Sequence, residues 1–306
     1  MTLLHSSALS NSALRSAVLG LGGKIPVAAG QRRLAVLVAG MHRSGTSAVA
    51  GCLAASGIPM GERLMPPTDD NPKGYFEHLD VVALHEAVLR ALGRSWDDPR
   101  ALPEGWLDRP MVREVEKAMA DWIERTFATA PVFAIKDPRI SRLLPLWSRV
   151  FHDIGIDVQV LHVLRHPAEV ASSLFARDRM PSTVALLLWC AYNVDIATQR
   201  SALRTTLVRY PEIVGADSDW LPAGLARRAG SDPMAAAAAV KDFLDPALRR
   251  QASPEFDSAV LPELVDVALG LDAAFRGQRN DLDFMLARWR DTIAPLLDAE
   301  PATEAR

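Results

Sequence analysis

The sequence predicts an α/β fold in which helices flank a parallel sheet, followed by a helical C-terminal third. Three observations predict this fold. Short continuous apolar runs, typical of strands that are buried on both faces, alternate with longer helical stretches. The first apolar run leads through a glycine-bounded loop into a helical stretch, which is how an α/β unit begins. After Tyr210 the patterns are mostly helical.

Four apolar runs are predicted to be strands, and they are 34–39, 132–135, 158–164 and 205–208. Helices are predicted at 48–56, 81–92, 110–127, 167–177, 184–203, 221–229, 234–243, 259–275 and 283–297. These elements divide the chain into a tail or weak amphipathic helix at 1–33, a domain at 34–298 and a polar tail at 299–306. Within the domain, 34–210 is the expected α/β core and 211–298 is a helical extension.

Composition and charge argue against several classes of protein. The 306 residues are 49% hydrophobic, which is enough for a sizeable core, and the formal net charge of -3 argues against bulk nucleic-acid binding. No apolar run is long enough to span a membrane. The two cysteines, Cys52 and Cys190, offer neither metal-ligand spacing nor a disulfide framework. We therefore expect a reduced, cytoplasmic protein without a metal site.

The loop after the first predicted strand has the glycine spacing of a phosphate-binding P-loop. Residues 40–47 read GMHRSGTS, with Gly40 and Gly45 in the pattern G-x-x-x-x-G-K-[ST]. Backbone amides of such a loop converge on an anion, and the following helix N-terminus adds a favourable dipole. The residues expected to donate hydrogen bonds to the phosphate are Ser44, Gly45, Thr46 and Ser47. A plain glycine-bounded turn is the alternative interpretation.

The loop departs from the P-loop pattern at one position. Thr46 stands where nucleoside-triphosphatases carry the lysine that reaches the β- and γ-phosphates, so ATP or GTP hydrolysis is disfavoured. A positive charge lies instead inside the loop, at Arg43. The loop is therefore expected to hold a phosphate with its cation in another place.

A second basic motif follows the third predicted strand. That strand runs into Arg165, and Ser173 lies eight positions later on the following helical stretch. Together with GMHRSGTS, this pair resembles the PAPS-dependent sulfotransferases, where PAPS is 3′-phosphoadenosine-5′-phosphosulfate. The segments NPKGYFEH and IKDPRISRLLPLW also look like segments of bacterial sulfotransferases and of the related tyrosylprotein branch. The likeness runs from about Leu34 to Tyr210.

The resemblance implies a role for each matched residue. Arg43 would bind the 5′-phosphate and the bridging oxygen of the donor, whereas Arg165 and Ser173 would bind its 3′-phosphate. Lys136, which ends a predicted strand, would stabilise the sulfuryl group, and Glu77 would be the general base. The alternatives are an ion pair between Lys136 and Asp137, a solvated Glu77, and His78 as the base. Tyr210 is expected either to contact the nucleotide or to pack in the core.

The sequence departs from the family in three respects, one of which is that the motif carrying the histidine base of the cytosolic members has no match here. The cytosolic members carry lysine at the position of Arg43, whereas the tyrosylprotein and carbohydrate branches also use arginine. The basic C-terminal loop that often completes the 3′-phosphate site has no clear match, and the basic residues that could replace it are Arg177, Arg179, Arg227 and Arg249.

The sequence favours a sulfotransferase that moves a sulfuryl group from PAPS to an acceptor hydroxyl by in-line displacement, without a metal. A carbohydrate acceptor is preferred by analogy with similar bacterial proteins alone. One alternative is a P-loop nucleotide or small-molecule kinase, which explains the glycine loop but not Thr46. Another is a non-catalytic nucleotide-binding module, which does not explain why the proposed catalytic residues are all present.

Overall fold

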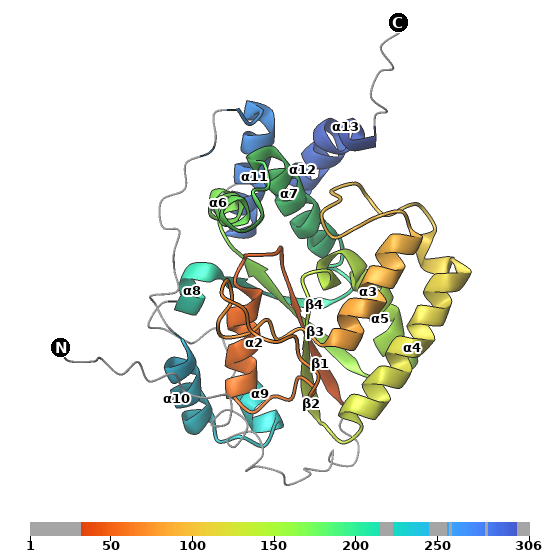
Figure 1. The fold of residues 1–306 in the computed structure, drawn as a ribbon, viewed down its shortest axis with the longest axis vertical. Helices are drawn as coiled ribbons and strands as arrows, with labels where there is room; N and C mark the ends of the chain where they lie inside the picture. The colour runs from red at the N-terminus through yellow and green to blue at the C-terminus, as the bar shows by residue number, and fades with distance from the viewer. Residues whose placement is uncertain (1–31, 215–222, 245–255, 257–258, 279–280, 299–306) are drawn as a thin grey trace, which may run out of the picture.

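The computed structural model describes residues 32–214, 223–244, 256, 259–278 and 281–298. The described residues form one sheet with the strand order β2-β1-β3-β4, and each neighbouring pair is parallel (Figure 1). The strands are β1 (Leu34–Ala39), β2 (Val132–Lys136), β3 (Asp157–Leu164) and β4 (Arg204–Arg209). This arrangement confirms the predicted α/β fold class with a parallel sheet flanked by helices.

Strand β1 lies inside the sheet, between β2 and β3. Its Leu37 pairs with Ile135 on one side and with Val160 on the other. Its side chains alternate between two hydrophobic clusters, so the strand is apolar at every position. Because all four strands are parallel, their carboxyl ends lie at one edge, which is where ligands of open α/β sheets bind.

Helices cover both faces of the sheet. In the core half of the chain they are α2 (Thr46–Ala55), α3 (Leu79–Ala91), α4 (Pro110–Phe127), α5 (Ile140–Asp153), α6 (Pro167–Asp178) and α7 (Ser182–Thr198). Helices α3, α4 and α5 lie on one side of the sheet and α2 on the other (Figure 1). Beyond the last strand the described segments are helical, and they are α8 (Tyr210–Val214), α9 (Ala223–Arg228), α10 (Pro233–Phe243), α11 (Pro262–Phe275), α12 (Leu282–Arg288), η3 (Trp289–Ile293) and α13 (Ala294–Asp298).

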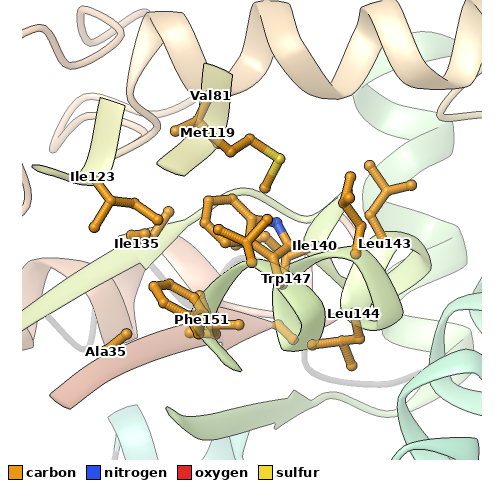
Figure 2. Packing of buried hydrophobic residues seen from close by; sticks show 14 of the residues in the cluster. Ala35, Val81, Met119, Ile123, Ile135, Ile140, Leu143, Leu144, Trp147 and Phe151 are labelled. Atoms are coloured by element: carbon orange, nitrogen blue, oxygen red, sulfur yellow. The ribbon is translucent and has the colours of Figure 1, made fainter. Parts of the chain in front are cut away.

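The larger hydrophobic cluster joins α4 and α5 to the sheet. Trp147 and Phe151 of α5 stack with ring centroids 5.4 Å apart, and Met119 and Ile123 of α4 lie in the same cluster (Figure 2). The sequence analysis assigned no helix to α5. Pro145 interrupts its pattern, and the chain kinks just before it, where Leu143 has non-helical dihedral angles.

Other differences concern boundaries. The predicted helix at 184–203 ends at Thr198, and the predicted helix at 283–297 includes a π-helical stretch at Trp289–Ile293. The expected tails at 1–31 and 299–306, including the weak amphipathic helix, lie outside the described residues, as does Arg249.

Candidate active site

The glycines of the phosphate loop are required by backbone geometry and by close neighbours. Gly40 has a φ of +152°, and a Cβ atom there would lie 2.5 Å from the Val163 carbonyl oxygen. Gly45 has a φ of +97°, and its Cβ atom would lie 2.5 Å from the Tyr210 ring. Arg43 also has a positive φ, of 69°, which is uncommon for a residue with a side chain. The loop is therefore a built conformation, in which the Arg43 backbone is strained.

The loop leaves polar groups available for an anion. Helix α2 begins at Thr46, and its N-cap residue Gly45 offers no side chain to accept hydrogen bonds from the first amides of the helix. The Ser44 hydroxyl is buried and has no hydrogen-bond partner in the described part of the chain. Buried unpaired polar groups are rare in folded proteins and often mark a site that a ligand or water satisfies. This cradle fits a bound phosphate.

The two predicted phosphate motifs meet in the structure. Arg43 donates from Nε to the Ser173 hydroxyl at 2.9 Å, and Arg165 donates to the Arg43 carbonyl oxygen at 3.1 Å. Arg165 also pairs with Glu169 at 2.7 Å and lies 4.2 Å from the ring centroid of Tyr210. The loop after β1 is therefore in direct contact with both Arg165, which precedes α6, and Ser173 within α6. Tyr210 packs against both motifs, so its core-packing role and its place in the site coincide.

Lys136 and Glu77 form a buried ion pair beside the loop. The Lys136 ammonium lies 2.5 Å from Glu77 Oε1, and it also donates to the Ser47 hydroxyl at 3.2 Å. Both charged side chains are almost fully buried. Lys136 therefore pairs with Glu77 and not with Asp137, the partner that the sequence analysis gave as the alternative. Glu77 is likewise not the solvated loop residue that was its alternative.

His78 is used in a different way. Its Nδ1 accepts a hydrogen bond from the Asp80 amide at 3.3 Å, which caps the N-terminus of α3. Its ring packs edge-on against Trp122 at 4.9 Å, and burial lowers its pKa. Between the two candidate bases, this capping role favours Glu77.

Behind the ion pair lies a buried chain of hydrogen bonds that the sequence analysis did not identify. Trp147 donates to His85 Nε2 at 2.9 Å, so a neutral His85 carries its proton on Nδ1 and donates to Asp137 at 3.0 Å. Asp137 also accepts from Arg139 at 3.1 Å. Burial alone would raise the pKa of Asp137, but His85 and Arg139 hold it well below its usual range. This series of hydrogen bonds ends near Glu77, whose Oε2 lies 3.8 Å from an Arg139 nitrogen.

Residues 68–77, which we call the strap, cross over the phosphate loop. Asp70 accepts hydrogen bonds from Thr68 at 2.5 Å and from the Tyr75 hydroxyl at 2.6 Å, and it pairs with Arg43 at 3.2 Å. Burial alone would raise the pKa of Asp70, but these partners lower it. Asn71 donates to Ser47 at 3.2 Å. Polar side chains of the strap therefore contact the loop at its middle, Arg43, and at its end, Ser47.

Of the described basic residues considered for the 3′-phosphate, Arg177 is the one whose charge affects Arg43. After burial, Arg177 is the largest influence that lowers the pKa of Arg43. Arg179 and Arg227 are exposed, and Arg249 lies outside the described residues. Arg177 pairs with its neighbour Asp178 at 2.5 Å.

The described residues contain neither a metal-binding cluster of side chains nor a helix that could span a membrane. No group of three or more His, Cys, Asp or Glu side chains is arranged to hold a metal ion in the described ranges. No described helix combines the length and the apolar character needed to cross a membrane.

No family model matches the chain, and no curated protein matches it. Among solved structures, the sulfotransferase domain from the Synechococcus PCC 7002 olefin synthase is similar over 87% of this chain and 90% of its own, with a TM-score of 0.38 and 17% sequence identity. A similarity of this size carries no argument about function, so the functional conclusion depends on the site itself.

Proposed function

We propose that this chain is a sulfotransferase that moves a sulfuryl group from PAPS to an acceptor hydroxyl. The observation that carries the proposal is the direct contact between two separate phosphate motifs. The loop after β1 and the start of α6 are far apart in the sequence, yet Arg43 bonds to Ser173 and Arg165 bonds to the Arg43 backbone. A donor with phosphates at both its 3′ and 5′ positions needs two such anion sites side by side.

The residues fit the donor chemically. The uncapped N-terminus of α2 and the unpaired Ser44 hydroxyl suit the 5′-phosphate. Arg165 and Ser173 suit the 3′-phosphate, and Arg177 is a further cation whose charge is felt at Arg43. Arginine and hydroxyl donors together satisfy the several acceptor oxygens of a phosphate. Tyr210 holds Arg165 against the loop by a cation–π contact.

The transfer step requires positioning and charge stabilisation. A new S–O bond forms to the acceptor oxygen while the bridging S–O bond of the donor breaks, and adenosine 3′,5′-bisphosphate leaves. Arg43 and Lys136 stabilise the charge on the bridging and sulfuryl oxygens, as preorganised cations do in phosphoryl transfer. Glu77 takes the proton of the acceptor hydroxyl, which requires that its carboxylate be freed from Lys136.

A carbohydrate hydroxyl is the proposed acceptor, by analogy with similar bacterial proteins. The competing kinase function has less support. Thr46 occupies the position of the P-loop lysine, and Asp137, the candidate metal ligand after an apolar strand, is fully buried and bonded to His85 and Arg139. A carboxylate with these partners is not available to Mg²⁺.

The proposal is tested by calorimetry with adenosine 3′,5′-bisphosphate and, separately, with ATP plus Mg²⁺. We expect clear binding of the bisphosphate, weak binding of ATP, and loss of bisphosphate binding in Arg165→Ala. Ser173→Ala should weaken binding by about tenfold, since it removes one hydrogen bond to a charged group. Ser172→Ala, on the exposed face of the same helix, is the matched control. Tight ATP binding with no response to the bisphosphate would overturn the proposal in favour of the kinase.

A further inference from the structure

His42 is a residue of the phosphate loop that the proposed function leaves without a role. Its imidazole lies 4.6 Å from the Trp96 ring and 6.0 Å from the Tyr192 ring, measured between centroids. Its Nε2 atom is buried and has no hydrogen-bond partner in the described residues. A buried nitrogen without a partner calls for an explanation, because folded proteins pair nearly all such atoms.

The aromatic rings that pack against His42 are themselves held in place by hydrogen bonds. Tyr192 donates from its hydroxyl to the Trp96 carbonyl oxygen at 2.7 Å. The segment that follows Trp96 is fixed by Arg142, which donates to the carbonyl oxygens of Asp98 at 2.8 Å and Arg100 at 2.6 Å. The aromatic walls around the imidazole are therefore anchored to the protein, while its Nε2 atom has no partner in the described residues.

The charge around His42 favours an anionic partner. Burial lowers its pKa well below the usual value, and Arg139, Arg177 and Lys136 lower it further, against the opposing effect of Asp137. The imidazole is therefore neutral at pH 7, with one N–H donor and one acceptor nitrogen. A neutral N–H group that is subject to the field of these three cations can donate to an anion without adding a further charge.

We propose that the His42 Nε2–H group donates a hydrogen bond to the sulfuryl group of the donor. The inference rests on the proposed function, and it adds a specific contact to the group that is transferred. His42 precedes Arg43, the cation assigned to the bridging oxygen, and Lys136 lies close enough to act on its pKa. The sulfuryl group distinguishes PAPS from adenosine 3′,5′-bisphosphate, so His42 would let the protein tell the substrate from the product.

The test compares the affinities of the full chain for PAPS and for adenosine 3′,5′-bisphosphate, measured by calorimetry without any acceptor. His42→Phe keeps a ring between Trp96 and Tyr192 but removes both nitrogens. We expect it to weaken PAPS binding by about tenfold, the value of one hydrogen bond to a charged group, and to change bisphosphate binding less than about twofold. His42→Gln places an amide nitrogen near the position of Nε2 and should restore the preference for PAPS. Thermal unfolding of each variant confirms that it is folded.

Each outcome decides a different statement. If the unmodified protein bound neither PAPS nor adenosine 3′,5′-bisphosphate, the proposed function would be overturned. Normal binding of both ligands, with His42→Phe weakening both equally or neither, would overturn the role of His42 and leave the proposed function standing. If His42→Phe weakened PAPS binding and His42→Gln did not restore it, the role of His42 would also be overturned, because the loss would then not depend on an N–H donor at this position.

Discussion

The buried pair of Glu77 and Lys136 leads to a quantitative prediction about stability. Glu77→Gln removes the negative charge beside the Lys136 ammonium, whose side chain is 2% exposed, and leaves it with neutral acceptors such as the Ser47 hydroxyl at 3.2 Å. Removing one partner of a buried ion pair costs about 3–5 kcal/mol, because it leaves an uncompensated charge. Lys136→Met should cost less, about 1–3 kcal/mol, because Glu77 keeps Arg139 at 3.8 Å.

The double variant decides whether the pair is coupled. With both charges removed, neither group is left uncompensated, so we expect the double variant to lie within about 2 kcal/mol of the unmodified protein. The free energies of unfolding are measured by urea titration with tryptophan fluorescence as the signal. The coupling free energy should then exceed about 2 kcal/mol.

A matched pair on the surface gives the control. Glu114 and Lys117 are 2.9 Å apart, but their side chains are 72% and 71% exposed. The same cycle at this pair, Glu114→Gln with Lys117→Met, should give a coupling of about 0.5 kcal/mol or less. Additive single variants at Glu77 and Lys136, within about 0.5 kcal/mol, would refute the description of the site as a coupled buried pair.

Three further predictions concern the loop, the strap and the core. Gly45→Ala should lower the free energy of unfolding more than Gly74→Ala does. Both glycines have a φ near +95°, but only at Gly45 would an added Cβ atom meet a neighbouring side chain, the Tyr210 ring. Equal losses of the free energy of unfolding in urea titrations would contradict this. Asp70→Asn should tighten bisphosphate binding by about fivefold in calorimetry, because it removes a negative charge 3.2 Å from Arg43. The same substitution at the exposed neighbouring residue, Asp69→Asn, should have little effect. Weaker bisphosphate binding in Asp70→Asn would refute this prediction. Burial lowers the pKa of His162 to about 4, so the unfolded chain takes up this proton first and stability falls by about 3 kcal/mol as the pH drops from 6.5 to 4. His162→Gln should flatten that slope in urea titrations at a series of pH values, and an unchanged slope would exclude His162 as its source.

The sequence predicted the sheet and the edge where the site lies because these follow from local patterns. Buried parallel strands are apolar at every position, so β1 is recognised with the bounds that the structure has. A loop or basic residue directly after such a strand must lie at the carboxyl edge. The pairing of Arg43 with Ser173 could not be read from the sequence, because it depends on how α6 packs against the loop.

The residues that the sequence analysis missed act through contacts distant in the chain. His85 lies on α3 and Trp147 on α5, and their hydrogen bond depends on the packing of these helices. The sequence gives one local signal for this series of hydrogen bonds, which is that Asp137 and Arg139 lie two positions apart directly after a strand. Asp70 is similar, since a proline-rich loop gives no indication of which loop residue it will contact.

The cations of the site are matched by partners within the protein, which has a consequence for the order of events. Under the proposed function, Glu77 becomes a base only when the sulfuryl group competes for the Lys136 ammonium. Glu77→Gln removes the competing carboxylate, so the free ammonium should bind PAPS about threefold to tenfold more tightly, with bisphosphate binding unchanged. Calorimetry with both ligands measures this difference. If Glu77→Gln instead weakened PAPS binding alone, Glu77 would be holding Lys136 in place for the donor, and the exchange of partners would be excluded.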